Sequence, residues 1–236
     1  MLEDLTTYLP SLLNGLKLTV LITLVAMALA LVLGLLLAVG QLNRERWYLW
    51  LPCRALVEFI RGTPLLLQIF YAYFVLPRLG IALEPLQAGT LALALNFGCY
   101  ISEVYRAGIE AVPKGQLEAG RTLGLSELRI LQRIVIPQAV RVVVPPLGNY
   151  LLTLFKDTAL LSTISIVELM FATNLVAATN FRYVEMYTVA LVVYFVISFP
   201  SSLALRALER RLKAPPLGPR KAAALSRPDL TAVGRR

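Results

Sequence analysis

The sequence predicts an all-α membrane protein with five transmembrane helices. Hydrophobic residues make up 58% of its 236 residues, and the mean hydropathy is +0.70. Multi-span membrane proteins have this balance, whereas soluble domains rarely do. Three segments carry no charged side chain, and they contain 26, 18 and 20 residues: Leu18–Asn43, Pro85–Ser102 and Met186–Leu205. A helix needs roughly 20 residues to cross about 30 Å of hydrocarbon, so these segments predict the first, third and fifth spans.

The second and fourth predicted spans are less uniform. The second, Leu49–Leu76, contains three charged side chains spaced so that they can pair along one helix face: Arg54, Glu58 and Arg61. Pro64 predicts a kink within this span. The fourth, Val142–Leu161, is interrupted by Lys156 and Asp157.

The distribution of basic residues predicts the orientation. Of the 23 Lys and Arg residues, 19 fall between spans 1 and 2, with Arg54 and Arg61 counted in that group, between spans 3 and 4, or after span 5. Because cytoplasmic segments are enriched in Lys and Arg, the N-terminus is predicted outside and the C-terminus inside. A six-span topology would break this alternation. The net charge of +9 is thus attributed to topology and not to nucleic-acid binding, since there is no compact basic domain.

The remaining segments are predicted to lie outside the bilayer or to pack against the spans. Residues 1–15 are expected to form a short external lead that ends at Asn14-Gly15. Ser162–Asn180 is apolar but rich in Ser, Thr and Asn, so a packed or re-entrant element on the external side is predicted. Residues 214–236 are rich in Pro, Ala and Arg, and we expect a disordered basic cytoplasmic tail. The membrane domain is then 1–213.

A long polar loop, at about residues 113–137, interrupts this apolar chain on the predicted cytoplasmic side. A short helix is expected over Gln116–Leu123, with Gly124 as its stop. Ser126 is a suitable N-cap for a second short helix that continues to about Val135.

The spacing within this loop resembles a known signature. Glu118-Ala119-Gly120, then Gly124, and then Ile134-Val135-Ile136-Pro137 follow the pattern EAA-x3-G-x9-I-x-L-P, with two mild changes. The pattern is that of the cytoplasmic coupling loop in permease subunits of bacterial binding-protein-dependent ABC importers. Five further segments resemble the polar amino acid branch of that family: Phe59–Leu65, Val112–Gln116, Pro137–Ala139, Pro145–Asn149 and Lys156–Leu160. The resemblance covers about residues 10–210.

The resemblance implies a type I ABC permease fold and a multi-pass location in the bacterial inner membrane. Two five-helix subunits, either two copies or two homologous permeases, would form the pore. A partner ATPase would bind ATP and Mg²⁺, and an extracytoplasmic binding protein would deliver a polar amino acid. The chain itself is then expected to be no enzyme and to bind no cofactor. A permease for another small solute, such as methionine or an osmolyte, is the alternative, and a stand-alone channel or secondary transporter is a weaker one.

Seven loop residues are candidates for contact with the ATPase: Leu117, Glu118, Ala119, Gly120, Gly124, Leu128 and Leu131. The carboxylate of Glu118 would pair with a basic residue of the ATPase, and the leucines would enter its groove. The alternative is a solvated amphipathic loop on the membrane surface. The same loop contains G-x4-G-R-T at residues 115–122. This run has Arg where a phosphate-binding P-loop has Lys, and no strand precedes it, so no ATP site is predicted.

The candidate residues for a substrate path lie in the second and fourth spans. Charged groups deep in a membrane mark a path by default, and Asp157 lies roughly 18 Å along the helix from Pro145. Asp157 either binds the ammonium group of an amino acid or forms an ion pair with Lys156 or Arg61. Candidates that accompany Asp157 are Asn149, Tyr150 and Arg61. Without histidine and with only two cysteines, the chain offers no transition-metal site and no catalytic residues.

Overall fold

The computed structural model describes residues 2–212, with side chains from Tyr8 onward. The predicted tail, 214–236, lies outside the described residues. All regular structure in the described part is helical. The elements are α1 (Leu2–Leu42), α2 (Trp47–Arg61), α3 (Leu65–Phe70), the π-helix η1 (Tyr71–Val75), the 3-10 helix η2 (Leu76–Leu79), α4 (Pro85–Glu110), α5 (Lys114–Thr122), α6 (Glu127–Ile130), the π-helix η3 (Leu131–Val135), α7 (Ile136–Asp157), the 3-10 helix η4 (Thr158–Ile164), α8 (Leu169–Asn180) and α9 (Tyr183–Leu212).

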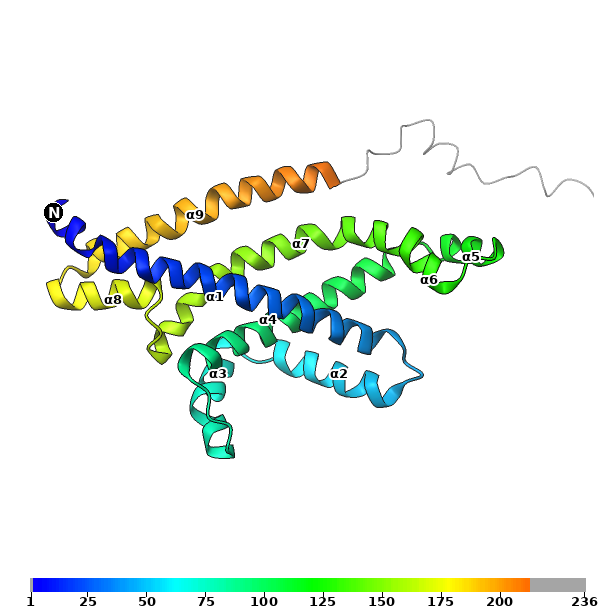
Figure 1. Ribbon diagram of the computed structural model, residues 1–236, viewed down its shortest axis with the longest axis horizontal. Coiled ribbons are helices and arrows are strands. Elements are labelled where there is room, and N and C mark those ends of the chain that lie inside the picture. The colour runs from blue at the N-terminus through cyan, green and yellow to red at the C-terminus, as the bar shows by residue number, and fades with distance from the viewer. Residues whose placement is uncertain (1, 213–236) are drawn as a thin grey trace, which may run out of the picture.

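The long helices run along the longest axis of the molecule (Figure 1). The start of α1 and α8 lie at one end, and α5 and α6 lie at the other. Three helical segments are long and apolar enough to cross a membrane: Tyr8–Leu42, Glu127–Ile164 and Tyr183–Leu212. The pair α2 and α3 to Leu79 adds a fourth if it is counted as one bent span. The prediction of membrane-spanning helices is therefore confirmed, while α4 does not meet this criterion.

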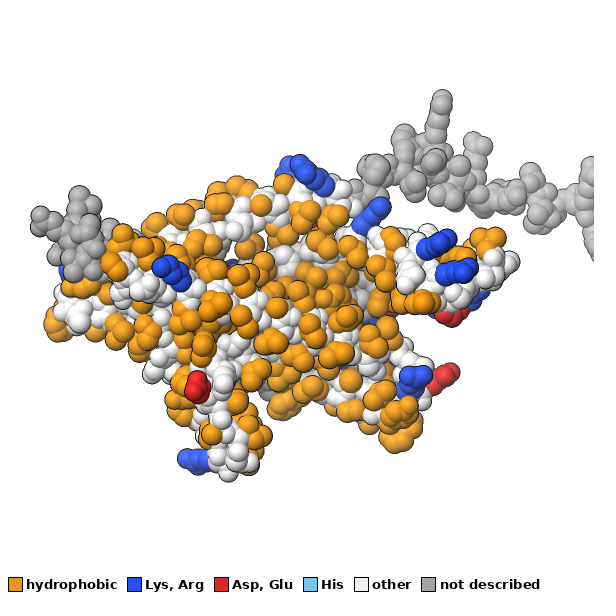
Figure 2. All heavy atoms as spheres, in the orientation of Figure 1, with side chains coloured by type: hydrophobic (Ala, Val, Ile, Leu, Met, Phe, Trp, Pro, Cys, Tyr) orange, Lys and Arg blue, Asp and Glu red, His pale blue; other side chains and the backbone are white. Residues whose placement is uncertain are grey.

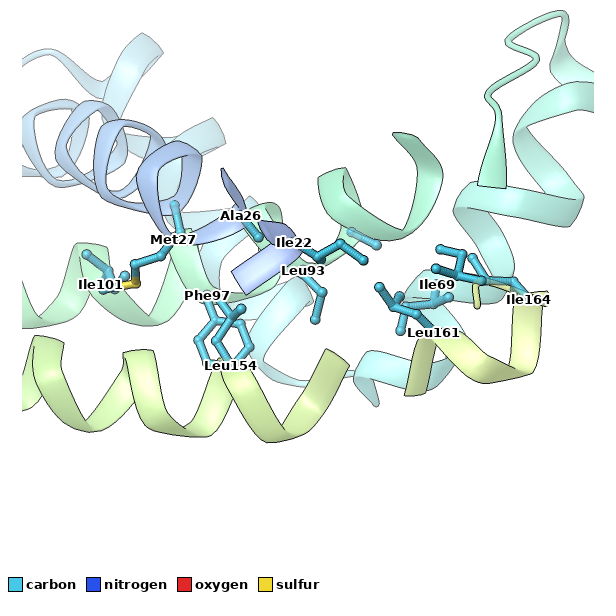
Figure 3. Packing of buried hydrophobic residues seen from close by; sticks show 13 residues of the cluster. Ile22, Ala26, Met27, Ile69, Leu93, Phe97, Ile101, Leu154, Leu161 and Ile164 are labelled. Atoms are coloured by element: carbon cyan, nitrogen blue, oxygen red, sulfur yellow. The ribbon is translucent and has the colours of Figure 1, made fainter. Parts of the chain in front are cut away.

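Helix α4 is buried at the centre of the protein. Its Leu93, Phe97 and Ile101 pack against Ile22, Ala26 and Met27 of α1 and against Leu154 of α7 (Figure 3). Helices α1 and α4 approach closely because Gly34 of α1 lies at their contact. A Cβ atom on Gly34 would be 2.8 Å from Ile101 Cγ2 and 2.9 Å from the carbonyl oxygen of Gly98. Because neighbouring helices cover it, α4 carries buried polar residues that a lipid-facing helix would not tolerate.

The second predicted span is broken rather than kinked. The chain bends by 110° between α2 and the helical segment Leu65–Leu79, across Gly62-Thr63-Pro64. Proline lacks an N–H group, so carbonyls in the preceding turn lose their helical partners. The Thr63 hydroxyl donates to the carbonyl of Phe59 at 3.1 Å, and Gln68 Nε2 donates to the carbonyl of Ile60 at 2.8 Å. A kink at Pro64 was predicted, whereas the full break and the contribution of Gln68 were not.

Two predictions about the charged and external segments need correction. Arg54 and Arg61 were counted as part of a cytoplasmic loop, but both lie inside α2. Asn14-Gly15 was expected to end an external lead, but α1 runs through it without a break. Gly15 serves packing instead, because its Cβ would lie 2.9 Å from Cβ of Ala172 on α8.

The segment from Ser162 to Asn180 is a packed element, as predicted. Glu168 is fully buried and caps α8 by accepting hydrogen bonds from the amides of Met170 and Phe171, at 3.0 and 2.8 Å. Its carboxylate also accepts from the hydroxyls of Thr19 at 3.4 Å and Tyr194 at 3.3 Å. These bonds tie α8 to α1 and α9.

Candidate functional site

Residues 113–135 fold into a compact unit at one end of the molecule, which we call the coupling knob. Helix α5 ends where predicted, at a left-handed Gly124 with φ of 73°. The amide of Leu125 donates to the carbonyl of Gly120 at 3.1 Å, and that of Gly124 donates to Arg121 at 2.9 Å. This pair of bonds is a Schellman motif, which only glycine adopts without strain.

The coupling knob has a hydrophobic core of its own. Val112, Ile130 and Val135 are buried together, and Leu117 packs against them. Gly120 is also buried, and its Cβ would lie 3.0 Å from Ile134 Cδ1. The two arms of the knob therefore pack tightly at the position where the signature normally has alanine.

The second arm of the knob differs from the prediction. It was expected to end before Pro137, but α6 continues through η3 directly into α7. Pro137 lies in the first turn of α7, directly after the π-helix η3, so it falls inside a continuous helical segment and not at a free helix start. Ser126 occupies the N-cap position of α6, but its side chain makes no capping hydrogen bond. The knob is consequently joined rigidly to the membrane-embedded part of the chain.

The exposed face of the knob contains most of the candidate docking residues. Glu118, Ala119, Leu128 and Leu131 are exposed, whereas Leu117 faces the knob core. Leu123, which sequence reasoning missed, has 79% of its surface exposed. The available signal in the sequence was its position directly before Gly124, where the helix ends and side chains lie at the surface. Exposed leucines around a carboxylate form a surface suited to a protein partner.

Polar contacts hold the two arms of the knob together. Arg121 donates to both carboxylate oxygens of Glu127, at 2.8 and 3.3 Å. This hydrogen bond lowers the pKa of Glu127 and raises that of Arg121. Gln138 Nε2 donates to Gln116 Oε1 at 2.6 Å. The run 115–122 lies within α5, and so has helical rather than P-loop geometry.

Two candidate substrate-path residues, Arg61 and Tyr150, come together in one cluster. The Arg61 guanidinium lies over the ring of Tyr100, 5.3 Å from its centroid. Tyr100 in turn contacts Tyr150, with ring centroids 5.9 Å apart. Phe97 completes the cluster with an edge contact to Tyr150 at 6.1 Å.

The other two candidates lie elsewhere on α7. Asn149 is exposed and lines a groove of about 340 Å³ together with Arg141, Pro145, Pro146 and Glu209. Asp157 is the last residue of α7 and is partly buried. Among the described residues it forms no ion pair with Lys156 or Arg61. The carboxylate nearest to Arg61 is that of Glu103, at 4.0 Å.

The sequence did not indicate two sets of contacts near these residues. Tyr100 and Glu103 of α4 contact Arg61, and Asn96 Nδ2 of α4 donates to Gln68 Oε1 of α3 at 3.0 Å. For the Asn96–Gln68 pair the available signal was the presence of two amide side chains within apolar segments, since buried amides need partners.

The surface of the protein fits a membrane subunit. Hydrophobic side chains cover the middle of the face seen in Figure 2, and charged side chains gather around the α5–α6 end and at the margins. Together with the coupling knob, this surface indicates the class of protein, a membrane-embedded subunit that presents a polar knob at one end.

Comparison with known proteins agrees with this class. Residues 30–214 match the family described as "Binding-protein-dependent transport system inner membrane component", and the chain belongs to this family. A probable amino-acid ABC transporter permease, y4tG of Sinorhizobium fredii, is 39% identical over 86% of this chain and 88% of its own length. The probable glutamine ABC transporter permease GlnM of Bacillus subtilis is 38% identical over 85% and 92%.

A solved structure has the same fold. It is described as an amino acid ABC transporter with histidines, and it matches with a TM-score of 0.83 and 33% identity. The match covers 88% of this chain and 96% of that chain. The chain therefore has the type I ABC permease fold, and the inner membrane fits the family description.

Proposed function

We propose that this chain is the pore-forming subunit of an ATP-driven importer of polar amino acids. It pairs with a second permease, either a copy or a homologue. A separate ATPase binds ATP and Mg²⁺, and an extracytoplasmic binding protein delivers the substrate. The observation that carries this proposal is the coupling knob, whose own core supports an exposed carboxylate and exposed leucines at the end of two long helices.

The knob transmits movement because it is continuous with the membrane helices. Helix α4 leads into it through Ala111–Pro113, and α7 follows it without a break. When the ATPase subunits close on ATP, the knob moves as a rigid body and tilts α4 and α7. Access to the path then alternates between the two sides of the membrane.

The proposed topology has five crossings, by α1, the bent pair α2–α3, α4, α7 and α9. The start of α1 lies at the end of the molecule opposite the knob (Figure 1), which supports an odd number of crossings between these two points. The knob is cytoplasmic in this arrangement, and the N-terminus is outside. The alternation of basic residues supports the same orientation.

The proposed substrate path passes Arg61, Asn149, Tyr150 and Asp157. Asp157 lies in the membrane domain without an ion-pair partner among the described residues, which suits the ammonium group of an amino acid. Tyr150 and Tyr100 offer hydroxyls and aromatic faces beside the Arg61 guanidinium. The names of the relatives, which refer to amino acids, support the same substrate class.

Reconstitution of the purified subunits in liposomes tests this proposal. Uptake of a labelled amino acid should require the permease, the ATPase, the binding protein and ATP together. Uptake without the ATPase would indicate a channel or secondary transporter instead. Thermal stabilisation of the binding protein across a panel of amino acids identifies the substrate. If only methionine or an osmolyte stabilises the binding protein, that solute and not a polar amino acid is the substrate.

A further inference from the structure

Five charged side chains join α2 to the last two turns of α4, and Glu103 is at their centre. We call this set the charge cluster: Arg54, Arg61, Glu103, Arg106 and Glu110. Glu103 Oε1 accepts a hydrogen bond from Arg54 at 3.2 Å, and Oε2 accepts one from Arg106 at 2.6 Å. Arg61 Nη1 lies 4.0 Å from Oε2. The Glu103 carboxylate therefore interacts with three guanidinium groups.

The charge cluster connects the base of the coupling knob to the break between α2 and α3. Arg106 also donates to Glu110 at 2.7 Å, and Glu110 is the last residue of α4 before the coupling knob. On the other side, Arg61 is the last residue of α2, immediately before the 110° break. A continuous series of ionic contacts thus leads from the base of the knob to the break between α2 and α3.

The hydrogen bonding of the charge cluster is incomplete. Arg61 Nε and Arg106 Nε are buried and have no hydrogen-bond partner. Native proteins leave few such groups unpaired, so each unpaired group requires an explanation. The Glu103 side chain is 19% exposed, and salt screens such a partly buried charge less than a surface charge. Spare donors around one shielded carboxylate permit a second arrangement, in which the guanidinium groups exchange positions.

We infer that Glu103 is a positioning residue that couples movement of the knob to the angle between α2 and α3. When the ATPase moves the knob, α4 shifts and carries Glu103 along α2. Arg54 and Arg61 then follow the carboxylate, and the break at Gly62-Thr63-Pro64 changes its angle. This inference rests on the proposed function, because it requires an ATPase at the knob.

The variant Glu103→Gln tests this inference in the reconstituted complex of permease, ATPase and binding protein. Glutamine keeps the size of the side chain but removes its charge, so α2 and α4 lose their ionic contact. We expect the number of amino acid molecules imported per ATP hydrolysed to fall about tenfold, near the upper range of measured coupling energies. Copurification with the ATPase and basal ATP hydrolysis should persist, because the knob is intact.

The matched control is Glu58→Gln, which removes the Arg54–Glu58 pair within α2 but leaves the contact between α2 and α4. This control should keep the wild-type transport ratio. Arg54→Gln breaks the same contact from the other helix and should reproduce the defect, and the double variant should be no worse than Glu103→Gln alone. Such non-additivity would not follow from two independent losses of stability.

The outcomes separate this inference from the proposed function. A wild-type transport ratio in Glu103→Gln overturns the inference while ATP-driven uptake by the wild type still stands. Loss of assembly in both Glu103→Gln and Arg54→Gln also overturns it, since that result indicates a folding role. Absence of ATP-dependent uptake in the wild-type complex instead contradicts the proposed function itself.

Discussion

The coupling knob and the Arg61–Tyr100–Tyr150 cluster differ in how the sequence encodes them. The knob is built almost entirely from residues within one stretch of about 25 positions, and its core, turn and ion pair are local. The cluster joins side chains from α2, α4 and α7, up to 89 positions apart in sequence. A compact local unit can thus be predicted from spacing alone, whereas a cluster between membrane helices depends on tertiary packing.

The largest expected effect on this comparison comes from Ile130→Ala in the knob core. Ile130 is 3% exposed, and truncation of a buried isoleucine costs about 2–5 kcal/mol. Because the knob core is separate, protease sensitivity should rise within 113–135 and not in the membrane helices. Limited proteolysis of the purified protein measures this. Leu128→Ala is the control, since Leu128 is 62% exposed. Equal sensitivity of both variants would show that the knob has no core of its own.

The second test makes the same substitution in the knob and at a contact between two membrane helices, α1 and α4. Gly34→Ala forces a methyl group to within 2.9 Å of a backbone carbonyl oxygen of α4, and such overpacking costs about 1–3 kcal/mol. Gly115→Ala in α5 meets nothing within 4 Å and should stabilise the helix by up to about 1 kcal/mol. Thermal unfolding in detergent should therefore give Tm shifts of opposite sign. A lower Tm for both variants would contradict the account of the knob surface.

The smallest effect concerns pH and the Arg121–Glu127 pair. The hydrogen bond from Arg121 lowers the pKa of Glu127 below its ordinary value of 4.5. A lowered carboxyl pKa stabilises the folded knob above that ordinary value, and the contribution is lost as the pH falls through the folded pKa. The difference in Tm between wild type and Glu127→Gln should thus be present at pH 6 and disappear toward pH 3. Because the pair is exposed, the shift should be small. A difference that persists at pH 3 would exclude the ion pair as its source.

Local signals were sufficient for some predictions and misleading for others. Gly124 was recognised as a helix stop because its effect depends only on adjacent backbone. Gly15 carries the same kind of signal, yet it lies inside α1, because its role is contact with Ala172, more than 150 positions away. A glycine in sequence does not reveal whether it permits a turn or a close helix contact.

Charged residues show the same limit. The spacing of Arg54 and Glu58 predicted their pairing along one helix face, and they do pair. Within α4, Arg106 lies three residues from Glu103 and four from Glu110, and it pairs with both. The contact of Arg54 with Glu103 spans 49 positions, and nothing in the local pattern indicated it. The charge cluster therefore becomes apparent only once α2 and α4 are placed side by side.

The variant Glu118→Lys tests whether the knob docks an ATPase through Glu118. The measurement is ATP-driven amino acid uptake in liposomes that contain the permease variant, the ATPase and the binding protein. Reversal of charge at a docking surface places like charges together, so uptake should fall by roughly tenfold or more. Membrane insertion should be unchanged. The control is Glu45→Lys, which reverses an exposed charge in the turn between α1 and α2. This variant should keep wild-type uptake. Normal uptake by Glu118→Lys would contradict the account.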